Sequence, residues 1–148
     1  MAVRVQAEDF DVAAEAEKLT AGRPDIGAIV TFTGRVRGGD RQIAALTLEH
    51  YPDMAEAELA RIEADAQSRW SLQASLIVHR VGELKVGDNI VLVVTASAHR
   101  QDAFEAAGFL MDYLKTRAPF WKKETMASGE SAWVEARTED ETAAKRWR

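Results

Sequence analysis

The chain contains no cysteine among its 148 residues. This absence excludes structural disulfides, thiolate zinc sites, iron–sulfur clusters and a cysteine nucleophile. It also means that the chain cannot carry sulfur as a persulfide of its own.

Long apolar runs are also missing, and the first ten residues, MAVRVQAEDF, lack the apolar core of a signal peptide. We therefore expect a cytoplasmic protein that does not enter a membrane. The chain has 19 basic against 24 acidic residues, and the net charge of −5 disfavours general nucleic-acid binding. The length, together with a hydrophobic content of 47%, predicts one globular domain over residues 1–148.

The common catalytic motifs are absent, including the glycine-rich nucleotide loops, the HExxH zinc motif and the GxSxG hydrolase motif. The three histidines, His50, His79 and His99, never form a close pair with metal-ligand spacing. We therefore expect neither a metal site nor a bound cofactor. Ser97, His99 and Asp102 are too close in one turn to converge as a hydrolytic triad, so Ser97 is better explained as a helix cap.

Hydrophobic periodicity predicts an α+β domain with mixed or antiparallel strands and about three helices. Helices are expected over 11–19, from an Asp53 cap to Trp70, and from a Ser97 cap to the residues before Pro119. Strands are expected over 26–34, 43–50, 74–80, 89–96, 120–124 and 131–136. Segment 35–41 is expected to be a basic loop, 81–88 a connection, and 138–148 a final helix or docked arm.

Cations at the ends of the predicted elements are the main functional signal. His99 and Arg100 lie at the expected start of the third helix, where backbone N–H groups favour an anion. Lys115 lies near the other end of that helix, where interaction with the helix dipole alone would explain a lysine. Lys122 lies in a short predicted strand, and a solvated edge strand would explain it equally simply.

Two further arginines, Arg35 and Arg37, are in phase with each other beside a Gly-Gly loop. This pattern is typical of a flap that grips a ligand and equally of a solvated hairpin tip. Segment 112–124 carries a net charge of +2, whereas 49–65 carries −5. From the pattern alone we predict an α+β domain with a localised anion site.

Six strings of the sequence resemble the large, catalytic subunit of molybdopterin synthase. They are TFTGRVR (31–37), LTLEHYPDM (46–54), HRVGEL (79–84), SAHRQDAFEA (97–106), MDYLKTRAPFWKKE (111–124) and WVEAR (133–137). The resemblance spans residues 26–147, and the string at 111–124 is highly specific. The family often carries lysine where Arg35 stands, a change that keeps the charge but alters the hydrogen-bond geometry.

This resemblance implies an α+β fold of the α/β-hammerhead type and a homodimer at the centre of a heterotetramer. Each end would bind a small ubiquitin-like sulfur-carrier subunit whose C-terminal Gly-Gly tail bears a thiocarboxylate. Two sulfur transfers would convert cyclic pyranopterin monophosphate (precursor Z) into molybdopterin, in molybdenum cofactor biosynthesis. The family's substrate-binding positions match Arg35, Arg37, His99, Arg100, Lys123 and Glu124, and its catalytic lysines match Lys115 and Lys122.

The chemistry of the residues agrees with this implication. A chain without cysteine must receive sulfur from a partner, and clustered cations suit both a cyclic phosphate and an anionic thiocarboxylate. Mutual repulsion among the cations would lower the pKa of a lysine toward neutral pH.

Two alternatives stay open at this point. The first is a non-catalytic dimeric module that binds a ubiquitin-like partner through its basic groove. The second is a nucleic-acid surface formed by Phe120, Trp121, Lys122 and Lys123, against which the net charge counts.

Overall fold

The structure is a computed structural model that describes residues 2–39, 42–134 and 138–148. The described elements, in chain order, are β1 (Ala2–Gln6), α1 (Val12–Thr20), β2 (Ala28–Arg35), β3 (Ile43–His50), α2 (Pro52–Arg69), β4 (Ala74–Arg80), β5 (Gly82–Lys85), β6 (Asn89–Ser97), α3 (Arg100–Arg117), β7 (Phe120–Met126), β8 (Ser131–Val134) and α4 (Thr138–Lys145). None of the helices in these ranges is long and apolar enough to cross a membrane.

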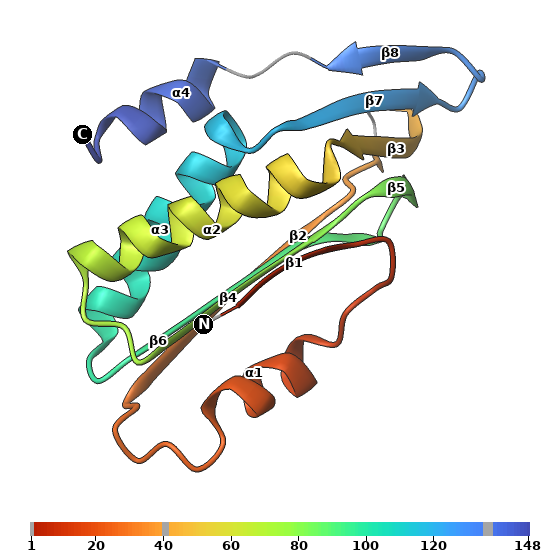
Figure 1. The fold of residues 1–148 in the computed structure, drawn as a ribbon. Helices are drawn as coiled ribbons and strands as arrows, with labels where there is room; N and C mark the ends of the chain where they lie inside the picture. The colour runs from red at the N-terminus through yellow and green to blue at the C-terminus, as the bar shows by residue number, and fades with distance from the viewer. Residues whose placement is uncertain (1, 40–41, 135–137) are drawn as a thin grey trace.

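The first sheet has the strand order β1-β4-β6-β2, in which β1 runs parallel to β4 and the other pairs are antiparallel. Helices α2 and α3 cover one face of this sheet and α1 covers the other (Figure 1). Alternate residues of the central strands therefore enter two cores. Ile77 and Val93 pack toward α2 and α3, whereas Val78 and Val94 pack on the side of α1. Burial on both faces explains why β4 and β6 are almost entirely apolar.

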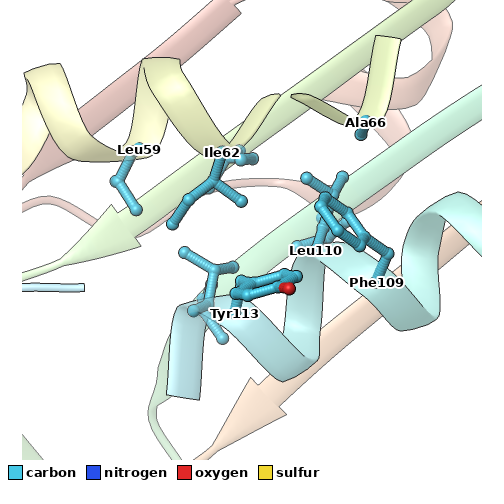
Figure 2. Packing of buried hydrophobic residues seen from close by; sticks show 10 residues of the cluster. Leu59, Ile62, Ala66, Phe109, Leu110 and Tyr113 are labelled. Atoms are coloured by element: carbon cyan, nitrogen blue, oxygen red, sulfur yellow. The ribbon is translucent and has the colours of Figure 1, made fainter. Parts of the chain in front are cut away.

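The main core lies between α2, α3 and the first sheet. Leu59, Ile62 and Ala66 of α2 face Phe109, Leu110 and Tyr113 of α3 (Figure 2). The Phe109 ring contacts Tyr113 edge-on, with ring centroids 4.6 Å apart. This packing fixes α3, whose two ends carry the cations singled out in the sequence.

The second sheet has the order β5-β3-β7-β8, with antiparallel pairing throughout these strands. It encloses a small core of Val36, Leu46, Leu48 and Leu84, against which Phe120 also packs. Strand β7 begins three residues after α3 ends, so the C-terminal turn of α3 lies close to this second sheet.

The outer edge of the first sheet is formed by β2. This strand pairs antiparallel with β6, so Ala28 lies opposite Ser97 and Arg35 lies opposite Asn89. Ile29 and Phe32 are 48% and 39% exposed, respectively. An eight-residue edge with exposed large apolar side chains is the kind of surface that pairs with another strand.

The α+β expectation is confirmed, and so are the strands over 43–50 and 74–80 and the end of α3 before Pro119. The tail forms α4, which brings the described helices to four where about three were expected. The strand expected over 131–136 is described as far as Val134, because residues 135–137 lie outside the described ranges, as do residues 40 and 41 of the expected basic loop.

Two strands were not predicted, β1 and β5. Segment 81–88, expected to be a connection, contains β5, in which Leu84 is buried while its neighbours are exposed. Its partner strand β3 lies more than 30 residues away in the sequence. Four residues are too few for periodicity to reveal such a strand, since its stability comes from cross-strand packing.

The predicted caps of the second and third helices were wrong. Tyr51 is the N-cap of α2, and Asp53 lies within the first turn. His99 is the N-cap of α3, whereas the Ser97 hydroxyl donates a 2.7 Å hydrogen bond to the carbonyl of Ser71. Ser97 is still in β6, because its backbone pairs with β2 and the helix starts three residues later.

Two residues stand out on the faces of these helices. Phe104 of α3 is 63% exposed, whereas Ala103 and Ala106 are buried. In the acidic helix α2, Glu63 is buried and accepts a 2.6 Å hydrogen bond from the Ser75 hydroxyl. Burial raises the pKa of the Glu63 carboxyl above its ordinary value.

Candidate functional site

A cavity of about 400 Å³ lies at the C-terminal end of α3 and is lined by residues of both sheets. We call it the cationic cavity. Six charged residues are among those that line it: Arg35, Arg37, Lys115, Lys122, Glu124 and Asp140. Four of these are basic, in a chain whose net charge is −5. The charge of this lining therefore suits anions.

The end of α3 brings the two lysines together. Lys115 lies in the last turn of the helix, which stops at Arg117 because Pro119 follows. The chain then enters β7, where alternation places Phe120, Lys122 and Glu124 on the cavity side.

Lys122 is half-buried, and its pKa is lowered to about 8. Burial is the largest cause, followed by the charge of Lys115 and a hydrogen bond between the two lysines. Asp140 and Glu124 act in the opposite direction. An amine with this pKa can gain or lose a proton near neutral pH, as general acid or base chemistry requires.

The two arginines enter the cavity from β2 and the loop that follows. The pairing of β2 with β6 is irregular between Gly34 and Arg35. An irregularity of this kind changes the direction in which the following side chain, here that of Arg35, points. The Arg35 guanidinium donates two hydrogen bonds to the carbonyl of Gly87, at 3.0 and 2.8 Å. Arg37 is exposed at the cavity rim.

Three of the predicted site residues lie elsewhere in this chain. Lys123 is on the opposite face of β7, with its ammonium 5.6 Å from the centre of the Trp133 ring. His99 and Arg100 are exposed at the N-terminal end of α3. Arg100 and Lys115 are separated along the helix by about 23 Å, at about 1.5 Å per residue. A single chain therefore does not bring these residues to the cationic cavity.

One charged lining residue, Asp140, was not predicted from the sequence. It lies in the first turn of α4, among the acidic residues 139–141. A favourable interaction with the helix dipole is enough to explain an acidic residue at this position. Its position at the cavity depends on how α4 packs against α3, which no local pattern reveals. Among the described residues, no group of three or more histidines and carboxylates could hold a metal ion.

His79 supports the wall of the cavity from behind. It is 7% exposed, and its ring stacks on Phe120 with centroids 3.9 Å apart. Its Nδ1 lies 2.9 Å from the carbonyl of Arg80, so Nδ1–H is the donor in this bond. His79 is therefore a structural histidine of β4. Burial is the main cause that lowers the pKa of His79 to about 4.

This pKa predicts a pH dependence of stability. Between about pH 6.5 and pH 4 the unfolded chain binds a proton at His79 that the folded chain does not bind, so stability falls as the pH falls. Between pH 7 and pH 5, His79 should lower the free energy of unfolding by about 2 kcal/mol. Urea unfolding at both pH values should show a smaller decrease for His79→Gln than for the wild type. An equal decrease in both proteins would contradict the prediction.

A second, shallower pocket lies on the opposite side of β7. It is lined by Glu49, His50, Tyr51, Trp121 and Trp133. Tyr51 and Trp121 contact each other edge-on, with centroids 5.0 Å apart. Its lining is aromatic, whereas the lining of the cationic cavity is basic, so the two faces of β7 differ in chemistry.

Comparison with known proteins identifies the family. The family model described as MoaE protein matches residues 5–117. The molybdopterin synthase catalytic subunit of Mesorhizobium japonicum is 60% identical over 147 residues, which cover 99% of this chain and 92% of that protein. The structure of the molybdopterin biosynthesis MoaE protein from Burkholderia ambifaria has a TM-score of 0.84 at 50% identity, covering 98% and 96% of the two chains.

A more distant structure, molybdopterin synthase from Staphylococcus aureus, has a TM-score of 0.81 at 32% identity and covers 88% of this chain and 95% of that one. The match thus extends over nearly the whole chain and includes both the lysines of the cationic cavity and the cations at the start of α3. This chain belongs to the MoaE family.

Proposed function

We propose that this chain is the catalytic subunit of a molybdopterin synthase. It transfers sulfur from the C-terminal thiocarboxylate of a small ubiquitin-like carrier to cyclic pyranopterin monophosphate (precursor Z). The observation that carries the proposal is the cationic cavity, in which Lys115 and Lys122 lie within hydrogen-bonding reach of each other and the pKa of Lys122 is about 8. The proposal includes a cytoplasmic location, which cell fractionation would test.

The charges of the cavity match both reactants. The thiocarboxylate and the cyclic phosphate are anions, and charge-assisted hydrogen bonds from arginine and lysine bind such groups strongly. Lys115, the more exposed lysine, polarises the thiocarboxylate and stabilises the negative charge that develops during transfer. Lys122 moves protons, and Glu124 orients it. The absence of cysteine fits a reaction in which the partner carries the sulfur.

The positions of His99 and Arg100 support a site that is shared between two copies of the chain. The N-terminal end of β2 lies beside Ser97, two residues before His99, and its C-terminal end carries Arg35 into the cavity. The strand spans about 24 Å, nearly the distance between Arg100 and Lys115 along α3.

Two copies could pair antiparallel through β2, with the two-fold axis near Thr31 and Phe32. Ala28 of each copy would then lie beside Arg35 of the other. This arrangement carries His99 and Arg100 of one copy to the cationic cavity of the other. A symmetric dimer of this kind uses the same edge twice, which suits the exposed Ile29 and Phe32. In this dimer, His99 and Arg100 join Arg37 in binding the phosphate and pterin.

Mixed dimers test the shared site. A dimer of one Lys122→Ala chain and one Arg100→Ala chain should recover about half of the wild-type activity, because one of its two sites contains both wild-type residues. The two chains would carry different affinity tags, and the mixed species would be isolated by two successive purifications. The matched control is a mixed dimer of Lys115→Ala and Lys122→Ala chains, which should stay inactive because both residues belong to the same cavity. If the Lys122→Ala and Arg100→Ala pair stayed inactive as well, each site would be formed within one chain.

Reconstitution tests the function itself. The purified chain would be combined with thiocarboxylated carrier and precursor Z, and the dithiolene product measured after oxidation to its fluorescent derivative. Product is expected only when both the chain and the thiocarboxylate are present. Carrier binding without product would favour the alternative function, a non-catalytic dimeric module for a ubiquitin-like partner. The convergence of two lysines in one cavity favours the enzyme, since docking alone does not require it.

A further inference from the structure

The C-terminal helix α4 is held firmly against α3. Trp147, just beyond the helix, donates a 2.6 Å hydrogen bond from its indole N–H to the Asp112 carboxylate, which also pairs with Arg146 at 3.1 Å. The Trp147 ring contacts Trp70 and Phe109 edge-on in the main core. Asp112 lies three residues before Lys115, so it shares a face of α3 with this lysine. The α4 segment is therefore anchored next to the cationic cavity.

Asp140 reaches the cavity from this anchored segment. Charged or titratable groups from several elements lie near the lysine pair: Arg35 and Arg37 from β2 and its loop, His79 from β4, Glu124 from β7 and Asp140 from α4. His50 of β3 lies one step further away, next to His79. Among these groups, the carboxylates are Glu124, which belongs to the same strand as Lys122, and Asp140, which comes from a separate element.

We propose that Asp140 is a positioning residue for sulfur transfer, whose carboxylate is the counter-charge that holds the Lys122 ammonium in the cavity against repulsion by Lys115. The reason is geometric. The two lysines are within hydrogen-bonding reach of each other, so two ammonium groups would drive one another apart unless an anion faces them. This inference rests on the proposed function, because the transfer is the reaction in which Lys122 acts.

The effect of Asp140 on Lys122 agrees with this geometry. Asp140 raises the pKa of Lys122 and partly offsets burial and the charge of Lys115. An acidic residue in the first turn of α4 also stabilises that helix through its dipole. Glu141 also lies in the first turn of α4 and is exposed, and it is not among the residues that line the cavity. It therefore provides a matched control for the effect on the helix.

The test measures Lys122 directly, without substrate. The full-length chain would be labelled at pH 7 with limiting acetic anhydride, and the acetylation rate of each lysine followed by mass spectrometry. The exposed Lys18 of α1 would be the internal reference. In Asp140→Asn, Lys122 should be labelled about threefold faster, because loss of the carboxylate increases its neutral fraction. Glu141→Gln should leave the rate unchanged, and Asp140→Glu should restore it toward the wild-type value.

A second measurement connects this effect to the reaction. The rate of sulfur transfer would be measured as a function of pH. The change in rate that follows the titration of Lys122 should occur at lower pH in Asp140→Asn and at an unchanged pH in Glu141→Gln. Tryptophan fluorescence, to which Trp147 contributes with the other three tryptophans, would verify that α4 stays docked in each variant. An unchanged labelling rate in Asp140→Asn, or an equal change in Glu141→Gln, would overturn the inference. If Asp140→Asn changed the labelling of Lys122 as expected but the wild-type chain made no product, the proposed function would be wrong and the pairing of Asp140 with Lys122 would stand. The two failures are therefore distinguishable.

Discussion

Replacement of Lys122 by alanine is expected to lower sulfur transfer by at least about 100-fold, while dimer formation and carrier binding stay nearly intact. Lys122 is half-buried in the cationic cavity and its pKa of about 8 suits proton transfer near neutral pH. The side chain lines the cationic cavity and is not part of the main core, so its loss should disturb the fold little. The measurement is single-turnover product formation at saturating carrier and precursor Z.

A second substitution separates the charge of Lys122 from its ability to titrate. Lys122→Arg keeps a positive charge but cannot release a proton at neutral pH, so it should stay nearly as inactive as Lys122→Ala. The control is Lys85→Ala, which removes an exposed lysine of β5 that is not among the residues lining the cavity. Wild-type turnover in Lys122→Ala would remove this residue from the mechanism, and full activity in Lys122→Arg would reduce its role to electrostatics.

The largest effect on stability is expected at Phe109. Phe109→Ala should lower the free energy of unfolding by about 3 to 5 kcal/mol, because it leaves a cavity in a closely packed core. Phe109 is fully buried and contacts Trp70, Tyr113 and Trp147 edge-on. Urea unfolding at pH 7 and a fixed protein concentration would measure the change.

Phe104 of the same helix provides the comparison. It is 63% exposed, so Phe104→Ala should change the free energy of unfolding by no more than about 0.5 kcal/mol. If both variants lost the same stability, the assignment of Phe109 to the core and of Phe104 to the surface would be wrong.

Much of the candidate site could be predicted because two local sequence features, a proline and an alternating strand, determine the positions of its residues. Pro119 determines where α3 ends, and the alternation in β7 determines which side chains share a face. Lys115 and Lys122 follow from these two features. Spacing alone could not distinguish them from solvated lysines, since the cavity between them depends on the second sheet. The resemblance to a known family provided that distinction.

The rest of the site could not be read from local patterns, for reasons that differ by residue. His99 and Arg100 were predicted, but their distance from the cavity emerges only when the length of α3 is set against the position of Lys115. Asp140 was missed because the packing of α4 on α3 depends on Trp147 and Asp112, which are far apart in the sequence. Ser97 was misread as a cap because its hydroxyl bonds to a distant carbonyl.

The charged lining of the cationic cavity runs from Arg35 to Asp140, a span of more than 100 residues. Bringing such distant segments together closes long loops, and contacts of this kind form late in folding. The pairing of β4 with β6 joins segments that lie nearer to each other in the sequence, so we expect it to form before Arg35 and Arg37 approach the two lysines. The full repulsion among the four cations is then expected only after this part of the first sheet has formed.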